Sequence, residues 1–156
     1  VKTISSMAAK GALGGKLVFL LHTLRVFLGY RFQHVRIRLD DQAPVEARIV
    51  LVAVANGRFF GGGMMLAPQA ATDDGLFDIV VLRPKGKFEM FRDLRLVYSG
   101  AHVALPSVTI QHCAQAHVEP LDDNPANFAL LDIDGESPGR IPATFRIRRR
   151  ALDIQA

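Results

Sequence analysis

The sequence is poor in cysteine, because Cys113 is the only one among its 156 residues. A single cysteine excludes an intramolecular disulfide bond and is typical of a protein in a reducing compartment. The first ten residues also lack the charged start, apolar run and small-residue cleavage site of a signal peptide. We therefore expect a cytoplasmic protein. Because the sequence begins at Val1 with no initiator methionine, we also expect it to be part of a longer protein.

Motifs of several functional classes are absent as well. The glycines lack the Gly-Lys-Ser/Thr ending of a P-loop and the G-x-G-x-x-G spacing of a dinucleotide-binding fold. There is no Gly-x-Ser-x-Gly of a hydrolase and no interleaved basic and aromatic stripe of an RNA-binding protein. The chain has 19 Lys and Arg against 15 Asp and Glu, a net charge of +4. This excess suggests an anionic partner, and by charge alone nucleic acid, a phosphate-bearing ligand and an anionic membrane surface all remain open. Because the basic and aromatic stripe is absent, we expect no nucleic-acid partner.

The composition that is present is typical of one globular domain. Hydrophobic residues make up 49% of the chain and charged residues 22%, and no repeat or linker divides it, so we expect residues 1–156 to form a single domain. Apolar residues recur at helical spacing over residues 17–28 and 88–98. The first of these helices is apolar on two sides and is either buried in the core or lines an apolar ligand site. It is shorter than the ~20 residues that span a bilayer.

Most of the remaining chain has the patterns of β-strands. Residues 34–39 and 108–118 alternate between apolar and polar side chains, which predicts half-buried strands. Residues 49–54 are apolar throughout, which predicts a central strand. Further strands are expected at residues 77–82, 128–133, 144–148 and 152–154. The sum predicts a mainly β fold, a β-sandwich or barrel with two accessory helices.

A glycine-rich stretch, residues 54–68, leads from one predicted strand toward the next. It contains Asn56-Gly57 and three consecutive glycines, Gly61, Gly62 and Gly63. Consecutive glycines occur mainly where the backbone must adopt positive φ or where another group approaches it closely. The stretch therefore predicts either a hairpin turn followed by a β-bulge or a place where a ligand approaches the backbone.

Two acidic motifs could carry chemistry. Asp73-Asp74-Gly75 is either a tight turn or a site where one carboxylate and nearby backbone carbonyls hold a hard cation such as Mg²⁺. Residues 132–136 hold three carboxylates, and Asp132 and Asp134 share a face if the chain is extended there. Such carboxylates repel each other, so we expect them to hold a cation, meet a basic group or raise one pKa, all useful for proton transfer. The alternative is an exposed acidic hairpin.

Arginines gather near the carboxyl end of the chain. Arg146, Arg148, Arg149 and Arg150 place positive charge along one predicted strand and the turn after it. Such a run is usually a solvated face, and the alternative is contact with anionic lipid head groups or phosphates.

Five ordered motifs together carry a resemblance to a known family. They are residues 54–63 (Val-Ala-Asn-Gly-Arg-Phe-Phe-Gly-Gly-Gly), 67–70 (Ala-Pro-Gln-Ala), 73–78 (Asp-Asp-Gly-Leu-Phe-Asp), 133–136 (Ile-Asp-Gly-Glu) and 139–145 (Gly-Arg-Ile-Pro-Ala-Thr-Phe). From about residue 17 to its end, the chain resembles the carboxy-terminal half of the bacterial diacylglycerol kinase family, which is related to sphingosine and ceramide kinases and more remotely to NAD kinases. The resemblance implies a β-sandwich that is the second domain of a two-domain lipid kinase, with ATP bound in the cleft between the domains.

The resemblance also implies roles for individual residues. Asp74 matches a carboxylate that binds a structural Mg²⁺, with the backbone carbonyls of Ala71 and Leu76 as co-ligands. Asp134 and Glu136 match acidic residues that accept the proton of the lipid hydroxyl, and the sequence leaves open which of the two takes it.

The same resemblance places Asn56 and the three glycines Gly61, Gly62 and Gly63 in one wall of the interdomain cleft. The helices over residues 17–28 and 88–98 would border a pocket for the acyl chains. The partners implied are a lipid substrate, ATP as co-substrate and the inner face of the membrane, and a homo-oligomer stays open.

One departure from the family pattern limits what this chain does alone. The Gly-Gly-Asp-Gly-Thr loop that holds the phosphates of ATP in this family does not occur in the sequence. Phosphoryl transfer depends on positioning and charge neutralisation at the phosphates, so we expect the isolated chain to be inactive as a kinase. Two alternatives remain: a non-catalytic lipid-binding or interaction module with the same sandwich, and an NAD kinase-like enzyme.

Overall fold

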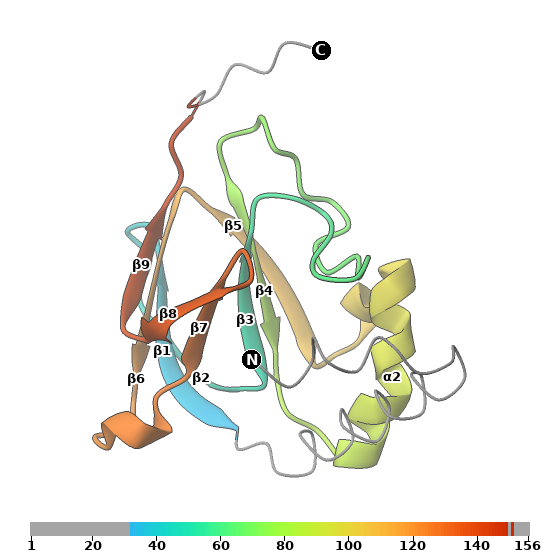
Figure 1. Cartoon of the computed structure of the whole chain (residues 1–156), viewed down its shortest axis with the longest axis horizontal. Helices are drawn as coiled ribbons and strands as arrows, with labels where there is room; N and C mark the ends of the chain where they lie inside the picture. The colour runs from blue at the N-terminus through green and yellow to red at the C-terminus, as the bar shows by residue number, and fades with distance from the viewer. Residues whose placement is uncertain (1–31, 150, 152–156) are drawn as a thin grey trace, which may run out of the picture. The chain divides into compact units, whose positions relative to one another are not determined.

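The computed structural model describes residues 32–149 and 151, which lie in the unit Phe32–Ala156. These residues form nine β-strands, one α-helix and two short 3-10 helices (Figure 1). The predicted helix over residues 17–28 and the predicted strand over residues 152–154 lie outside the described residues. The elements are β1 (Gln33–Leu39), β2 (Val45–Ile49), β3 (Leu51–Ala55), β4 (Phe77–Leu82), α2 (Lys87–Ser99), η1 (Ala101–Ala104), β5 (Val108–Cys113), β6 (Gln115–Pro120), η2 (Pro125–Asn127), β7 (Leu130–Ile133), β8 (Glu136–Arg140) and β9 (Ala143–Arg146).

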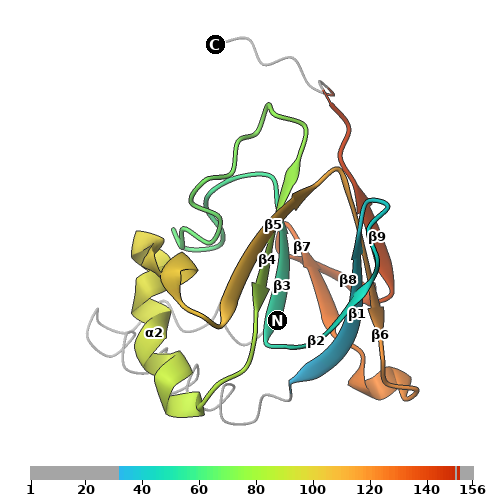
Figure 2. The same cartoon turned by 180° about the vertical axis from the view of Figure 1, so that it is seen from behind.

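Two antiparallel sheets face each other across a shared core. The first has the strand order β2-β1-β6-β9 and the second has the order β3-β4-β5, while β7 and β8 form a separate hairpin. Val35 and Ile37 of the first sheet join Ile79 and Val81 of the second in one buried cluster. Figures 1 and 2 show the two sheets from opposite sides. The prediction of a mainly β fold built as a β-sandwich is confirmed.

The helix α2 covers the other face of the second sheet. Val97 of α2 packs with Val80 of β4 and with Leu66 in a second buried cluster. The helix ends at Gly100, whose φ of 74° is the left-handed conformation that commonly follows a helix. The predicted helix over residues 88–98 is therefore confirmed as α2.

Two predicted strands are wrong in their connectivity, because the chain changes sheets within them. Residues 49–54 do not form one central strand: β2 ends at Ile49 in the first sheet, and β3 begins at Leu51 as the outer strand of the described second sheet. The run is apolar because Val52 and Ala53 of β3 pack against different core clusters. Residues 108–118 likewise divide at Ala114 into β5 and β6, which lie in different sheets.

Asp40 holds the chain at the second of these crossings. Its carboxylate Oδ1 accepts hydrogen bonds from the backbone N–H of Ala114 at 3.0 Å and of Gln115 at 2.8 Å. Alternating apolar residues run through the break, so the sequence pattern could not reveal it.

Among the described residues, no helix has the length and apolar character needed to cross a membrane.

Candidate functional site

The glycine-rich stretch and the acidic loop meet at one end of the β3–β4 pair. Ala55, the last residue of β3, pairs with Asp78 of β4, so residues 56–76 form one excursion that leaves and re-enters the sheet at the same place. Arg58 braces the excursion, since its Nε donates to the Ala70 carbonyl at 3.2 Å and its own carbonyl accepts from the N–H of Ala67 at 3.3 Å. The structure thus brings Asn56 and the Asp-Asp-Gly loop to the same end of the β3–β4 pair.

The three consecutive glycines form the turn of a small hairpin within this excursion. Phe60 and Met64 exchange two backbone hydrogen bonds, with N···O distances of 2.8 and 3.1 Å. Gly61 and Gly63 have positive φ angles of 53° and 90°, which glycine adopts without steric cost.

The space around this hairpin is open on the side of the glycines. A Cβ atom built on Gly57, Gly62 or Gly63 would meet no atom within 4 Å, and one on Gly61 would meet only the tip of Met64 at 3.3 Å. Gly62 has neither a positive φ nor a close neighbour among the described residues. The two residues before the hairpin turn, Phe59 and Phe60, are 64% and 48% exposed. Within the described part of the chain, the Cα of Gly62 therefore faces open space.

The Asp73-Asp74-Gly75 segment is a tight turn with the side chain of Arg149 beside it. Asp74 Oδ1 accepts a hydrogen bond from the backbone N–H of Leu76 at 2.8 Å, and Gly75 has a φ of 74°. Arg149 lies against Gly75, because a Cβ there would be 2.2 Å from the Arg149 Nε. Both Asp73 and Asp74 are exposed, whereas Gly75 is buried.

A further carboxylate, Asp78, lies beneath this turn at the start of β4. The residue is 1% exposed, and its Oδ1 has no hydrogen-bond partner, although the Nε2 of His112 lies 3.3 Å away. Burial raises the pKa of the Asp78 carboxyl; the nearby His112 opposes this shift, and the negative charge of Asp74 adds to it. Neither Asp78 nor His112 was predicted from the sequence as part of a site. The available signal was a single charged residue inside the apolar run 77–82, since a buried charge needs a partner.

The loop fits a cation. Burial is the main cause that raises the pKa of Asp78, and the negative charge of Asp74 adds to it, so the two carboxylates repel each other. Asp78 also has a buried oxygen without a hydrogen bond among the described residues. The described residues contain no group of three or more His, Cys, Asp or Glu side chains arranged around a metal position. The predicted ligand set is of another kind, because it combines one carboxylate with the backbone carbonyls of Ala71 and Leu76. Hard ions such as Mg²⁺ accept such oxygen ligands.

The second acidic motif occupies the turn of the β7–β8 hairpin. Asp134 and Gly135 both have positive φ angles, 50° and 87°, in a two-residue turn that favours Asp-Gly. Asp132 supports the turn, since its Oδ1 accepts a hydrogen bond from the backbone N–H of Gly135 at 3.0 Å. Asp134 therefore lies in the turn and not on an extended strand, and the expectation that it shares a strand face with Asp132 is wrong. Asp134 and Glu136 are both exposed.

The two acidic motifs are anchored to the same core cluster. Leu131 of β7 and Phe77, three residues after Asp74, both pack against the cluster that joins the two sheets. Met64 of the glycine hairpin packs instead against the cluster under α2. Leu131 and Phe77 therefore pack in the core between the two sheets, whereas Met64 packs in the core under α2.

The sequence of this chain is similar to a known domain family and to curated proteins. The family model described as YegS C-terminal NAD kinase beta sandwich-like domain matches residues 3–156. Two curated relatives named diacylglycerol kinase are 32% identical over 119 residues (Mycobacterium tuberculosis) and 26% identical over 131 residues (Bacillus subtilis). These matches cover 76% and 84% of this chain but only 37% and 41% of the relatives. The chain thus spans about two fifths of the length of these curated relatives.

A solved structure shares the fold. A crystal structure described as that of a diacylglycerol kinase from Bacillus anthracis matches with a TM-score of 0.62 and 26% sequence identity. The match covers 84% of this chain and 42% of that one.

Proposed function

This chain belongs to the family of YegS C-terminal NAD kinase beta sandwich-like domains, and on that premise we propose that residues 1–156 are the carboxy-terminal domain of an ATP-dependent lipid kinase. The substrate class we propose is a lipid alcohol such as diacylglycerol, as in the names of the curated relatives. The observation that carries the proposal is the Asp134-Gly135-Glu136 turn, which presents two exposed carboxylates on a hairpin fixed to the core.

The chemistry requires a base at the lipid hydroxyl. In the proposed reaction the hydroxyl oxygen bonds to the γ-phosphorus of ATP, the bond from that phosphorus to ADP breaks, and the hydroxyl proton passes to a carboxylate of this chain. Asp134 and Glu136 are the candidates, because both side chains are exposed and lie on either side of one turn residue. General-base catalysis of this kind contributes on the order of 10²- to 10⁴-fold to the rate.

We assign supporting roles in this reaction to the other motifs. Asp74, with the backbone carbonyls of Ala71 and Leu76, would hold Mg²⁺, whose positive charge offsets the repulsion between Asp74 and Asp78. Asn56 and the open glycine hairpin at Gly61, Gly62 and Gly63 would line the wall of a nucleotide cleft. Phosphoryl transfer also needs groups that neutralise the phosphates, so we expect the 156-residue chain alone to show no lipid phosphorylation.

The test is a pair of conservative substitutions in the full-length protein. Asp134→Asn and Glu136→Gln each remove one carboxylate without changing its size, and the substitution of the true base should lower kcat about 10²- to 10⁴-fold. Asp123→Asn is the matched control, because Asp123 is an exposed aspartate outside the motif. Circular dichroism and urea unfolding check that each variant keeps its fold. Near-normal turnover in both variants would contradict the proposal and favour a lipid-binding module without catalytic activity.

An NAD kinase-like activity is the second candidate, because the family description itself names NAD kinase. The two differ in the acceptor hydroxyl. Phosphate transfer from radiolabelled ATP to NAD but not to diacylglycerol would favour the second candidate, and transfer to lipid alone would support the first.

A further inference from the structure

The outward face of the β2-β1-β6-β9 sheet is rich in arginine. The core side chains Val35, Ile37 and Val118 point inward, so the residues that alternate with them point outward. By the strand register, the outward residues are His34, Arg36 and Arg38 of β1, Glu46 and Arg48 of β2, Gln115, His117 and Glu119 of β6, and Thr144 and Arg146 of β9. Four arginines against two glutamates make this face cationic. Residues far apart in the sequence supply it, so neither half of the chain alone indicates it.

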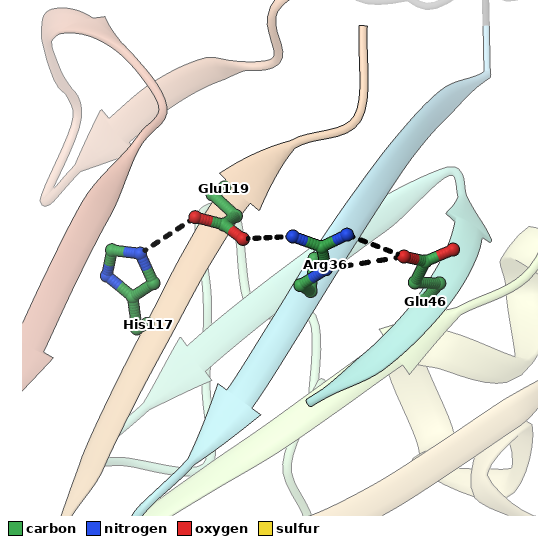
Figure 3. A network of polar contacts seen from close by, with 4 residues as sticks. All are labelled: Arg36, Glu46, His117 and Glu119. Atoms are coloured by element: carbon green, nitrogen blue, oxygen red, sulfur yellow. Dashed lines mark hydrogen bonds and ion pairs between the residues drawn. The ribbon is translucent and has the colours of Figure 1, made fainter. Parts of the chain in front are cut away.

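One cross-strand row on this face shares a single arginine between two glutamates, so its formal charge is −1. Arg36 lies opposite Glu46 on one side and Glu119 on the other, at 2.8 and 2.9 Å (Figure 3). The hydrogen bonds that Arg36 donates to Glu46 and to Glu119 raise the pKa of Arg36, and Arg36 in turn lowers the pKa of Glu119. Exposed ion pairs of this kind contribute little to stability, so their main effect is to fix the positions of the charged groups.

The next row has no acidic residue. Arg38 lies directly opposite His117, and His117 lies opposite Thr144. The His117 Nδ1 is 2.7 Å from the Thr144 hydroxyl. The His117 Nε2 is 3.6 Å from Glu119, as Figure 3 shows from close by. Within the described part of the chain, the guanidinium of Arg38 has no hydrogen-bond or ion-pair partner. The row thus holds a fixed imidazole beside a guanidinium whose five N–H donors are all free.

These two rows enclose a hollow of about 220 Å³. Its lining comprises Arg36, Arg38, Pro44, His117 and Glu119. The charge of Glu119 is partly offset, because Arg36 donates a hydrogen bond to it while also pairing with Glu46. Among the cationic side chains of this lining, Arg38 is the one that no carboxylate of the described residues engages.

We propose that this hollow binds a phosphate group, with Arg38 as the main contact and His117 beside it. A free guanidinium presents a planar pair of donors that matches two phosphate oxygens, and such charge-assisted pairs are among the stronger hydrogen bonds. The site lies outside the acidic motifs and the glycine hairpin, so it is a binding site in addition to the proposed kinase chemistry. The phosphate belongs either to a soluble phosphate compound or to the head group of an anionic lipid.

The experiment measures phosphate binding with and without the free guanidinium. Inorganic phosphate is titrated into the 156-residue chain by calorimetry at one fixed ionic strength, and sedimentation is measured with vesicles of phosphatidylglycerol and of phosphatidylcholine. Arg38→Gln should weaken phosphate or phosphatidylglycerol binding about tenfold, the effect of losing a bidentate charged contact. Arg38→Lys keeps the positive charge but loses the planar pair of donors, so its affinity should lie between those of the unchanged chain and Arg38→Gln. Arg95→Gln, which removes an exposed arginine of α2, should bind as the unchanged chain does.

The outcomes distinguish a soluble phosphate compound from a lipid head group, and both from a nonspecific effect of net charge. Arg38-dependent binding of inorganic phosphate supports a soluble ligand, and Arg38-dependent binding to phosphatidylglycerol vesicles alone supports a lipid head group. Equal losses in Arg38→Gln and Arg95→Gln would show that only net charge matters and would overturn the proposal. Absence of binding to both probes would overturn it as well. If Arg38→Gln fails to fold, Arg38→Lys decides the matter, since equal affinity of that variant and the unchanged chain also counts against the guanidinium contact.

Discussion

Gly75 is the position in the candidate metal loop that tolerates a side chain least. Its φ is 74°, and a Cβ there would lie 2.2, 2.7 and 2.8 Å from the Nε, Cγ and Cδ atoms of Arg149. Real Cβ atoms do not approach other heavy atoms this closely, so the side chain of Arg149 would have to move. We predict that Gly75→Ala lowers the free energy of unfolding and weakens Mg²⁺ binding at the loop.

The size of the effect follows from three contributions. The left-handed conformation costs an alanine about 1–2 kcal/mol relative to glycine. Displacing the stem of Arg149 from its rotamer adds about 0.5–1.5 kcal/mol. Alanine also lowers the conformational entropy of the unfolded chain relative to glycine, which stabilises the folded state by about 0.4–1 kcal/mol. The net loss of stability should therefore lie between about 0.5 and 3 kcal/mol, with the midpoints of the three contributions giving about 2 kcal/mol.

Urea unfolding of four proteins separates the backbone contribution from the collision. These are the unchanged chain, Gly75→Ala, Arg149→Ala and the double variant. With the Arg149 side chain removed, Gly75→Ala should lower the free energy of unfolding only through the cost of the left-handed backbone. The coupling energy between Gly75→Ala and Arg149→Ala should therefore be about 0.5–1.5 kcal/mol. Gly62→Ala is the matched control, because Gly62 has no positive φ and no neighbour within 4 Å of an added Cβ. Its stability should change by less than about 0.5 kcal/mol.

Mg²⁺ supplies the functional readout of the same variants. A ligand that binds only the folded state raises the unfolding midpoint as its concentration increases. The unchanged chain should therefore gain stability with Mg²⁺, and Gly75→Ala should gain less, because Asp74 and the carbonyl of Leu76 flank the altered residue. A Gly75→Ala variant as stable as Gly62→Ala would refute the strain argument. An equal cost with and without the Arg149 side chain would refute the contact.

Two further predictions concern buried or paired side chains. Burial, more than the nearby Asp40, raises the pKa of the Cys113 thiol to about 11, and the residue is 1% exposed, so a thiol reagent at pH 8 should label it only as fast as the protein unfolds. Rapid labelling without urea would contradict this. Lys85 and Arg92 lower the pKa of Asp93, so this carboxylate stabilises the fold above the pKa of an unfolded aspartate and loses that contribution as the pH falls through its folded pKa. Asp93→Asn should therefore lower the urea midpoint at pH 7, and the difference should shrink below pH ~3; an unchanged difference at low pH would count against the ion pairs.

Local patterns predicted the elements better than their connections. The apolar run of β4 and the helical spacing of α2 are local, so their positions agree closely with the structure. The family relationship seen in the ordered motifs is also confirmed. The crossings at Val50 and Ala114 could not be predicted, because alternation with period two states which face a residue occupies but not which sheet its strand joins. At Ala114 the crossing depends on Asp40, which is 74 residues away in the sequence.

The candidate sites show the same division between local and distant information. The acidic turn at Asp134 was accessible from sequence because Asp-Gly at positive φ is a local preference. Asp78 was missed because its burial depends on β3 and β5, which flank it in the sheet. The phosphate hollow was missed for a related reason, since Arg38 and His117 become neighbours only through the register of β1 and β6.

The hairpin that carries Asp134 and Glu136 holds its shape without using either carboxylate. The positive φ angles of the turn, the hydrogen bond from Gly135 to Asp132 and the packing of Leu131 on the core all involve other groups. A residue that does not hold its own turn can change without loss of the fold, so loss of activity in Asp134→Asn or Glu136→Gln would report on chemistry. Both carboxylates are also exposed, so water is excluded from them only when a substrate or another part of the protein covers the turn. The proposed proton transfer therefore depends on a lipid bound over this turn, so shortening the lipid's acyl chains should lower kcat as well as raise KM.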